Sequence, residues 1–206
     1  MKQNVIFYMV AASPWSYFSF PRLTSIINSY NININIKPID LFKIFKEQGI
    51  KLVSERPKAI QINRINELKR WKKFLNIDMN IEPKFFPVNP LQSSKLILAA
   101  SINELEEKKP KTFKLSKRLA EAVWVKDEDI ANEDTLVSIA NDCGFNGIQL
   151  YSESNEKKII SLLEKNTSEA LEKNIFGVPS FIYDNEIYWG QDRIDFLERH
   201  IKKNTY

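Results

Sequence analysis

The sequence predicts an α/β fold in which a strand–helix–strand unit and a strand–strand–helix unit are separated by a long helical segment. Three observations in the 206-residue chain lead to this fold class. A short apolar run lies near the start, apolar residues recur at helical spacing between residues 41 and 174, and two β-rich segments flank Asp184-Asn185. Apolar periodicity is the main indicator of secondary structure in a single sequence.

The first strand is predicted over Val5 to Met9, because this run is nearly continuously apolar, as in strands buried on both faces. Ser13 then provides a helix N-cap, and Pro14 occupies the first helical position. The helix is expected to end at Tyr30-Asn31. Its apolar residues at helical spacing are Tyr17, Phe18, Phe20, Leu23, Ile26 and Ile27.

A second strand is predicted from Ile32 to Pro38, where isoleucines alternate with polar residues. Two strands joined by one helix favour parallel pairing with a right-handed crossover. The first 40 residues therefore form a βαβ unit.

The middle of the chain changes to long amphipathic segments without a convincing strand. The last predicted helix is expected to break near Asn166-Thr167-Ser168, where a new N-cap could begin another helix. The candidate helices are Leu41 to Glu47, Pro57 to Leu75, Leu91 to Glu107, Thr112 to Val125, Asp134 to Cys143 and Asn155 to Lys173.

Strand patterns return after Gly177. Residues 180–183 and 186–189 flank Asp184-Asn185, which tolerate the positive φ of a tight hairpin turn. A final helix follows from about Gln191 to Lys203. The sum is a thioredoxin-like fold interrupted by a large all-helical insertion domain. Residues 1–40 and 175–206 would form a discontinuous thioredoxin-like domain, and residues 41–174 the insertion, including the helix that returns to the core.

Composition excludes several classes of function. The 30 Lys and Arg residues are spread among 26 Asp and Glu residues, so no basic stripe for nucleic acid is expected. No stretch is long and apolar enough to span a membrane, and the N-terminal run resembles a strand rather than a signal peptide. Cys143 is the only cysteine, which favours a cytoplasmic protein without disulfides. His200 is the only histidine, so no metal site is predicted, and it is expected at the surface or a helix end.

Ser13 and Ser16 stand where a redox protein of this layout would carry two cysteines. Ser13 can be read as an ordinary N-cap. Alternatively, it can donate a hydrogen bond to a thiolate that arrives from outside, at a helix N-terminus that favours anions. Ser13 cannot ionise by itself without a base, and Ser16 is expected to be a packing or helix-capping residue.

Two loops near the end of the chain carry further candidates. A cis Val178-Pro179 bond would turn the backbone groups of Val178 outward to pair with an extended peptide, whereas a trans bond would simply start an edge strand. In the segment WGQDR (189–193), backbone N–H groups and Gln191 suit a carboxylate and Asp192 suits an ammonium. Asp192 could instead be an N-terminal helix charge or pair with Arg193.

Three segments, SPWSY (13–17), GVPSF (177–181) and WGQDR (189–193), resemble the 2-hydroxychromene-2-carboxylate isomerases and the kappa-class glutathione transferases of the DsbA-like thioredoxin superfamily. The resemblance extends to Lys46 in FKEQG (45–49), to FPVNP (86–90), and to Trp124 before Asp129-Ile130. It covers nearly the whole chain.

The resemblance implies that glutathione binds as a cofactor. Its sulfur would lie at Ser13, its cysteinyl backbone against Val178 and Pro179, and its γ-glutamyl end near Trp189, Gly190, Gln191 and Asp192. Lys46 and Asn89 would contact the substrate, with Lys46 holding its carboxylate; a plain surface lysine is the alternative. Two positions depart from the family pattern, since an acidic residue is common where Val10 stands and an asparagine where Ile50 follows Gly49.

The first hypothesis for the function is a glutathione-dependent cis–trans isomerase that acts on a small unsaturated oxo acid, because GQDR (190–193) is nearer to the isomerases. A kappa-like transferase or peroxidase acting on hydrophobic electrophiles is the alternative, and a non-catalytic glutathione-binding protein is a third. Thiol–disulfide exchange needs a thiolate that Ser13 and Ser16 cannot supply. The family is also compatible with a homodimer, although no sequence feature selects the surface.

Overall fold

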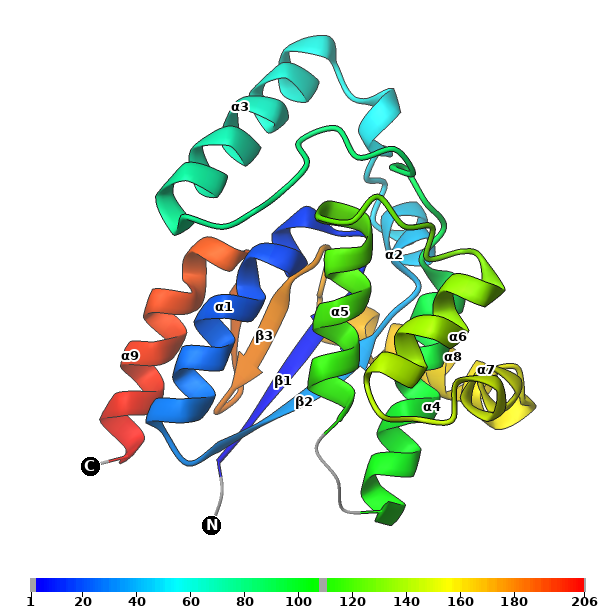
Figure 1. The fold of residues 1–206 in the computed structure, drawn as a ribbon. Coiled ribbons are helices and arrows are strands. Elements are labelled where there is room, and N and C mark those ends of the chain that lie inside the picture. Colours follow the sequence, from blue (N-terminus) through cyan, green and yellow to red (C-terminus); the bar gives the residue numbers. More distant parts are fainter. Residues whose placement is uncertain (1–2, 108–110, 206) are drawn as a thin grey trace.

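A four-stranded mixed sheet forms the centre of the protein. The computed structural model describes residues 3–107 and 111–205. The sheet has the strand order β2-β1-β3-β4 (Figure 1). Its strands are β1 (Gln3–Met9), β2 (Ile32–Pro38), β3 (Ser180–Tyr183) and β4 (Glu186–Trp189). The predicted strands are therefore confirmed, and β1 begins two residues earlier than expected.

Strand β1 is central and both of its faces are buried. It runs parallel to β2, with Tyr8 opposite Lys37, and antiparallel to β3, with Tyr8 opposite Ser180. Val5, Phe7 and Met9 face a large apolar cluster, while Tyr8 faces a smaller one on the other side. This alternation explains the continuous apolar run in the sequence.

Nine α-helices and two 3₁₀ turns surround the sheet in the described part of the chain. Helix α1 crosses between β1 and β2, and α9 packs beside α1 at the other end of the chain (Figure 1). The helices are α1 (Pro14–Ser29), α2 (Leu41–Glu47), α3 (Lys58–Leu75), α4 (Leu91–Glu107), α5 (Thr112–Trp124), α6 (Glu133–Asp142), α7 (Gly147–Ser154), α8 (Lys157–Glu172) and α9 (Ile194–Thr205), and the 3₁₀ turns are η1 (Val53–Glu55) and η2 (Gln191–Arg193).

The break predicted in α8 was wrong, because the polar residues at that place make tertiary contacts instead of a cap. Asn166 and Thr167 are buried. The Thr167 hydroxyl donates to the Leu163 carbonyl oxygen of the preceding turn and accepts from the Asp40 backbone N–H. Asn166 Nδ2 donates to the Pro38 carbonyl oxygen at 3.3 Å. The helix continues because both side chains find partners within it, at Pro38 of β2 or at Asp40 before α2.

Helix α7 was not predicted. Asn146 caps it by accepting from the Gln149 backbone N–H at 3.1 Å. The helix is short, and its Ile148 is 74% exposed, so no apolar stripe reveals it. Only the N-cap asparagine could have indicated it.

Helix α3 arches over the strand ends of the sheet, at the end where α1 begins (Figure 1). Leu68 is its only fully buried residue, so α3 rests on the rest of the protein along a narrow line. The segment after it is tied to α1, because the Tyr17 hydroxyl donates to the Asp78 carbonyl oxygen at 2.6 Å. Burial raises the pKa of Tyr17 to about 12, and the carboxylates of Glu121 and Asp78 act in the same direction.

The large apolar cluster contains residues of both predicted domains, for example Phe7 of β1 and Leu119 of α5. Helix α5 also packs on α1. The division into residues 1–40 with 175–206 and residues 41–174 therefore stays a prediction, whereas the thioredoxin-like fold with its inserted helices is confirmed.

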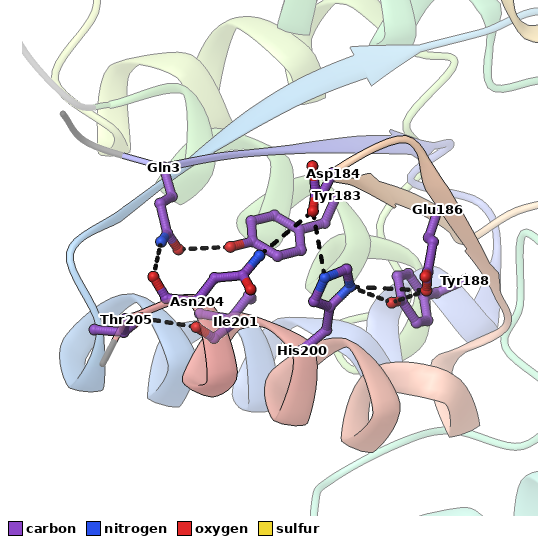
Figure 2. A network of polar contacts seen from close by, with 9 residues as sticks. All are labelled: Gln3, Tyr183, Asp184, Glu186, Tyr188, His200, Ile201, Asn204 and Thr205. Carbon is purple, nitrogen blue, oxygen red and sulfur yellow. Dashed lines mark hydrogen bonds and ion pairs between the residues drawn. The ribbon is translucent and has the colours of Figure 1, made fainter.

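His200 is a half-buried residue of α9 that is near the surface, as expected, and also packs against its neighbours. Its side chain is only 19% exposed and lies against the β3–β4 hairpin (Figure 2). The Tyr188 hydroxyl donates to Glu186 at 2.6 Å. It also shares a hydrogen bond of 2.7 Å with His200 Nδ1. The Asp184 carboxylate lies 3.5 Å from Nε2 on the other side. His200 therefore fastens α9 to the hairpin.

Candidate active site

Ser13 caps α1, as one of its two predicted roles required. Its backbone is extended, and its Oγ accepts from the Ser16 backbone N–H at 3.3 Å. Ser13 is 7% exposed, and within the described residues its hydroxyl proton has no acceptor. The first turn of α1 contains no acidic residue. The cap therefore leaves a hydroxyl donor and an uncompensated positive helix end, both suited to an anion.

Ser16 is completely buried one turn further along α1. Its backbone N–H, and not its hydroxyl, takes part in the cap. Its Oγ has no hydrogen-bond partner among the residues that the structure describes. Ser16 is therefore a packing residue beneath Ser13.

The loop before β3 lies beside the end of β1. The Val178–Pro179 peptide bond is cis. Pairing of β1 with β3 ends at Tyr8 and Ser180, and continuing this register by two residues places Val178 alongside Val10. Both valines belong to one apolar cluster, and Ser13 donates its backbone N–H to the Val10 carbonyl oxygen at 3.1 Å. This chain of contacts brings Val178 to the start of α1.

The backbone of Val178 is available to a ligand. Neither its N–H nor its C=O forms a hydrogen bond with any residue in the described ranges. The next polar group is occupied, since the Ser180 hydroxyl donates to the Gly177 carbonyl oxygen at 2.8 Å. Unpaired strand-end groups of this kind can pair with an extended peptide.

Trp189 covers the same loop from β4. Its ring packs against Phe176 with centroids 4.5 Å apart and ring planes inclined at 52°. A methyl group on Gly177 would lie 2.8 Å from Trp189 Nε1, so only glycine allows this approach. Trp189 is still 50% exposed and Phe176 39% exposed. The two rings form an open aromatic wall next to Val178, and Phe176 was not singled out in the sequence.

Gly190 and Gln191 connect this wall to α1. Gly190 has a φ of 97°, and its N–H donates to the Pro179 carbonyl oxygen at 2.9 Å. The Gln191 carbonyl oxygen accepts from Arg22 of α1 at 2.6 Å. The Gln191 side chain is 2% exposed, and its Oε1 has no partner among the described residues. A buried acceptor without a donor is costly and fits a ligand that brings an N–H group.

Asp192 forms an ion pair with Arg193, with Oδ2 2.8 Å from Nη1. This pairing was one of the alternative roles predicted for Asp192. Both side chains are about half exposed. Exposed pairs of this kind contribute little, so the carboxylate can still exchange Arg193 for a ligand's ammonium group.

Lys46 and Asn89 stand apart from these segments. Lys46 is exposed on α2 and forms no ion pair with a described residue. Asn89 is also exposed, and its side chain caps the following turn by accepting from the Leu91 N–H at 3.0 Å. Asn89 lines a cavity of about 460 Å³ together with residues of α2, α4 and α8, and neither Ser13 nor Val178 lies on its wall. Their contact with a substrate stays a prediction.

The positions that depart from the family pattern are apolar in the structure as well. Val10 is 1% exposed and packs in the cluster with Val178. The Ile50 backbone N–H donates to the Phe45 carbonyl oxygen at 2.8 Å, and its side chain is half-buried. Neither residue supplies a polar group to the site.

Other chemistries have little support near Ser13. Burial raises the pKa of the Cys143 thiol, which lies in a different part of the fold at the end of α6. Among the described residues, no group of three or more His, Cys, Asp or Glu side chains could hold a metal ion.

None of the described helices is both long and apolar enough to cross a membrane.

Comparisons with known proteins find similar chains that match nearly the whole sequence. A model of the DSBA-like thioredoxin domain family matches residues 4–202. The chain is 25% identical to 2-hydroxychromene-2-carboxylate isomerase of Pseudomonas putida over 197 residues, which cover 94% of this chain and 92% of that protein. It is 26% identical to human glutathione S-transferase kappa 1 over 200 residues, which cover 93% of this chain and 87% of that protein.

A solved structure supports the fold. The structure of a selenomethionine 2-hydroxychromene-2-carboxylate isomerase superimposes with a TM-score of 0.78 and 21% sequence identity, and the match covers 98% of this chain and 95% of the other.

Proposed function

The chain belongs to the DSBA-like thioredoxin domain family, and from this premise we propose that it is a glutathione-dependent isomerase of the 2-hydroxychromene-2-carboxylate type. Its relatives at about one quarter identity are isomerases and kappa-class glutathione transferases. In this proposal the substrate is a small unsaturated oxo acid, and the enzyme works in the cytoplasm.

One observation carries the proposal. The helix N-terminus beside the cis-proline loop presents a serine hydroxyl whose proton has no acceptor in the described part of the chain, where a disulfide enzyme would present a thiol. A donor at this place suits a sulfur anion supplied by another molecule.

The residues around Ser13 fit glutathione. The free N–H and C=O of Val178 match the cysteinyl backbone of a short peptide. The buried Gln191 Oε1 lacks a donor, which an ammonium or amide N–H of the peptide would provide. Asp192 offers a carboxylate to the α-ammonium group, and the exposed ring of Trp189 offers an apolar wall.

The protein's part in the reaction is to hold and stabilise charge. Ser13 donates a hydrogen bond from its hydroxyl to the ionised sulfur, and the first turn of α1 favours the same anion by about 0.3–2 kcal/mol. When bound, glutathione supplies a thiolate whose electron pair forms a C–S bond with the conjugated substrate and leaves again with the sulfur, so the product is an isomer and no oxidant is consumed. Lys46 of α2 attracts the substrate carboxylate. Asn89, in the segment just before α4, contacts the substrate as well.

A transferase is the alternative, because human glutathione S-transferase kappa 1 is as similar to the chain as the isomerase is. Both activities need the same bound thiolate. They differ in whether the sulfur leaves the substrate again. A protein that binds glutathione without turnover is the third reading.

The experiment that separates them supplies the purified protein with glutathione and 2-hydroxychromene-2-carboxylate and follows interconversion of the two isomers by absorbance. Glutathione-dependent interconversion supports the proposal. Conjugation of 1-chloro-2,4-dinitrobenzene without any interconversion would assign the transferase activity instead. Calorimetric titration with glutathione provides the baseline, since a failure to bind would remove all three readings.

A further inference from the structure

Arg64 of α3 is a cation without a counter-charge. Its Nη2 is buried and has no hydrogen-bond partner among the residues that the structure describes. None of the ion pairs formed within those residues involves Arg64. Its guanidinium lies over the ring of Phe86, 5.0 Å from the ring centroid. Buried guanidinium groups are normally paired, so this one requires an explanation.

A second arginine lies close enough to repel it. Burial, and secondarily the charge of Arg56, lower the pKa of Arg64 to about 10. Arg56 is held by its Nε, which donates to the Lys51 carbonyl oxygen at 3.0 Å, and by the ring of Phe45 at 5.8 Å. No acidic side chain in the described ranges pairs with Arg56 either. The charge of Arg56 therefore disfavours the charged form of Arg64.

A further unpartnered donor lies against the same ring. Trp124 is fully buried, its ring centroid is 5.0 Å from that of Phe86, and its Nε1 has no acceptor among the described residues. The groups without partners around Phe86 are thus N–H donors from two elements, α3 and α5. Only an acceptor, and most effectively an anion, satisfies such a set.

The place of these residues connects them with the candidate active site. Helix α3 arches over the strand ends of the sheet where α1 begins (Figure 1). Phe45 directly precedes Lys46 on α2, and the Arg56 guanidinium lies over the Phe45 ring. Arg64 is only partly buried as a whole residue, although its Nη2 is buried.

We propose that Arg64 and Arg56, with Trp124 Nε1 and the ring of Phe86, form a site for the carboxylate group of a flat, unsaturated organic acid. This assignment rests on the proposed function for the placement of that acid beside Ser13. The planar guanidinium fork of Arg64 binds the two carboxylate oxygens, and the aromatic rings accept the flat body of the acid. The site selects carboxylates over neutral electrophiles.

The test measures binding of trans-cinnamate and of its neutral methyl ester by calorimetry, in the absence of glutathione. Wild type binds cinnamate and binds the ester at least tenfold more weakly. Arg64→Gln weakens cinnamate binding at least tenfold, and Arg64→Lys gives an intermediate value because it keeps the charge but loses the fork. Arg70→Gln, which removes an exposed arginine of the same helix, leaves the affinity within twofold.

Urea unfolding distinguishes this role from a structural one. Arg64→Gln is at least as stable as wild type, because it removes a buried charge that has no partner. Equal cinnamate affinity of Arg64→Gln and wild type, or equal affinity of wild type for cinnamate and its ester, would overturn the proposal. Glutathione is titrated separately: if it does not bind but cinnamate binds in an Arg64-dependent way, the proposed function fails and the carboxylate site stands.

Discussion

The backbone N–H of Gly190 donates to the carbonyl oxygen of Pro179 at 2.9 Å and so joins the loop after β4 to the loop before β3. Pro179 follows the unpaired backbone of Val178, and Gly190 precedes the buried amide of Gln191. The bond fixes the distance between the two places at which a short peptide would be held. Its geometry depends on the positive φ of Gly190.

Replacing Gly190 by alanine should therefore weaken glutathione binding and stability together. A methyl group there would lie 2.5 Å from Asp192 Oδ1, in a backbone region that costs alanine about 1–3 kcal/mol. Gly49→Ala is the matched control, since Gly49 also has a positive φ but has no atom within 4 Å of the added carbon. We expect Gly49→Ala to lower stability only and to leave the glutathione dissociation constant unchanged. An equal loss of affinity in both variants would contradict the proposed role of the loop.

Replacing Ser13 by glycine should separate catalysis from capping. Glycine costs only a few tenths of a kcal/mol at an N-cap, whereas the lost hydrogen bond to a sulfur anion corresponds to about a 10- to 100-fold lower kcat. Much of the glutathione affinity is retained, because the other contacts remain. Ser16→Ala removes the neighbouring buried hydroxyl that has no partner in the described residues, and it should leave turnover nearly unchanged. Full activity of the glycine variant would take Ser13 out of the mechanism.

Lys46→Gln should raise KM for a carboxylate substrate about two- to fivefold, since an exposed ion pair contributes about 0.2–1 kcal/mol. Lys202→Gln provides the control, because Lys202 is an exposed lysine in the last turn of α9. Steady-state kinetics at saturating glutathione measure the effect. Identical KM values for the two variants would mean that Lys46 is a plain surface residue.

The protein should lose stability in alkali partly through Tyr17. Its pKa is raised to about 12 in the folded state, above the value of the unfolded chain. Its contribution is therefore complete below about pH 10 and is lost as the pH rises toward about 12. Tyr17→Phe should lower the free energy of unfolding at about pH 7 by about 0.5–1.5 kcal/mol. The difference from wild type should shrink at about pH 11, and urea denaturation at both pH values measures it.

Local patterns determined much of the fold. The β3–β4 hairpin and α4 lie at the predicted residues, and Ser13 caps α1 as its position before Pro14 indicated. These features depend on turn chemistry, apolar spacing and capping, which act over a few residues and can be read from the chain itself. The three segments that place the candidate site on Ser13, Val178 and Gln191 were also recognisable in the sequence.

Tertiary contacts decided the remaining features. Asn166 and Thr167 resemble a helix break until Pro38 and Asp40 satisfy them across the fold. Arg64 resembles a solvated helix residue until its guanidinium is found over Phe86 without an acceptor among the described residues. A sequence states which polar groups exist, but whether a buried group has a partner depends on residues distant in the chain. Only the folded structure therefore shows where a ligand is needed.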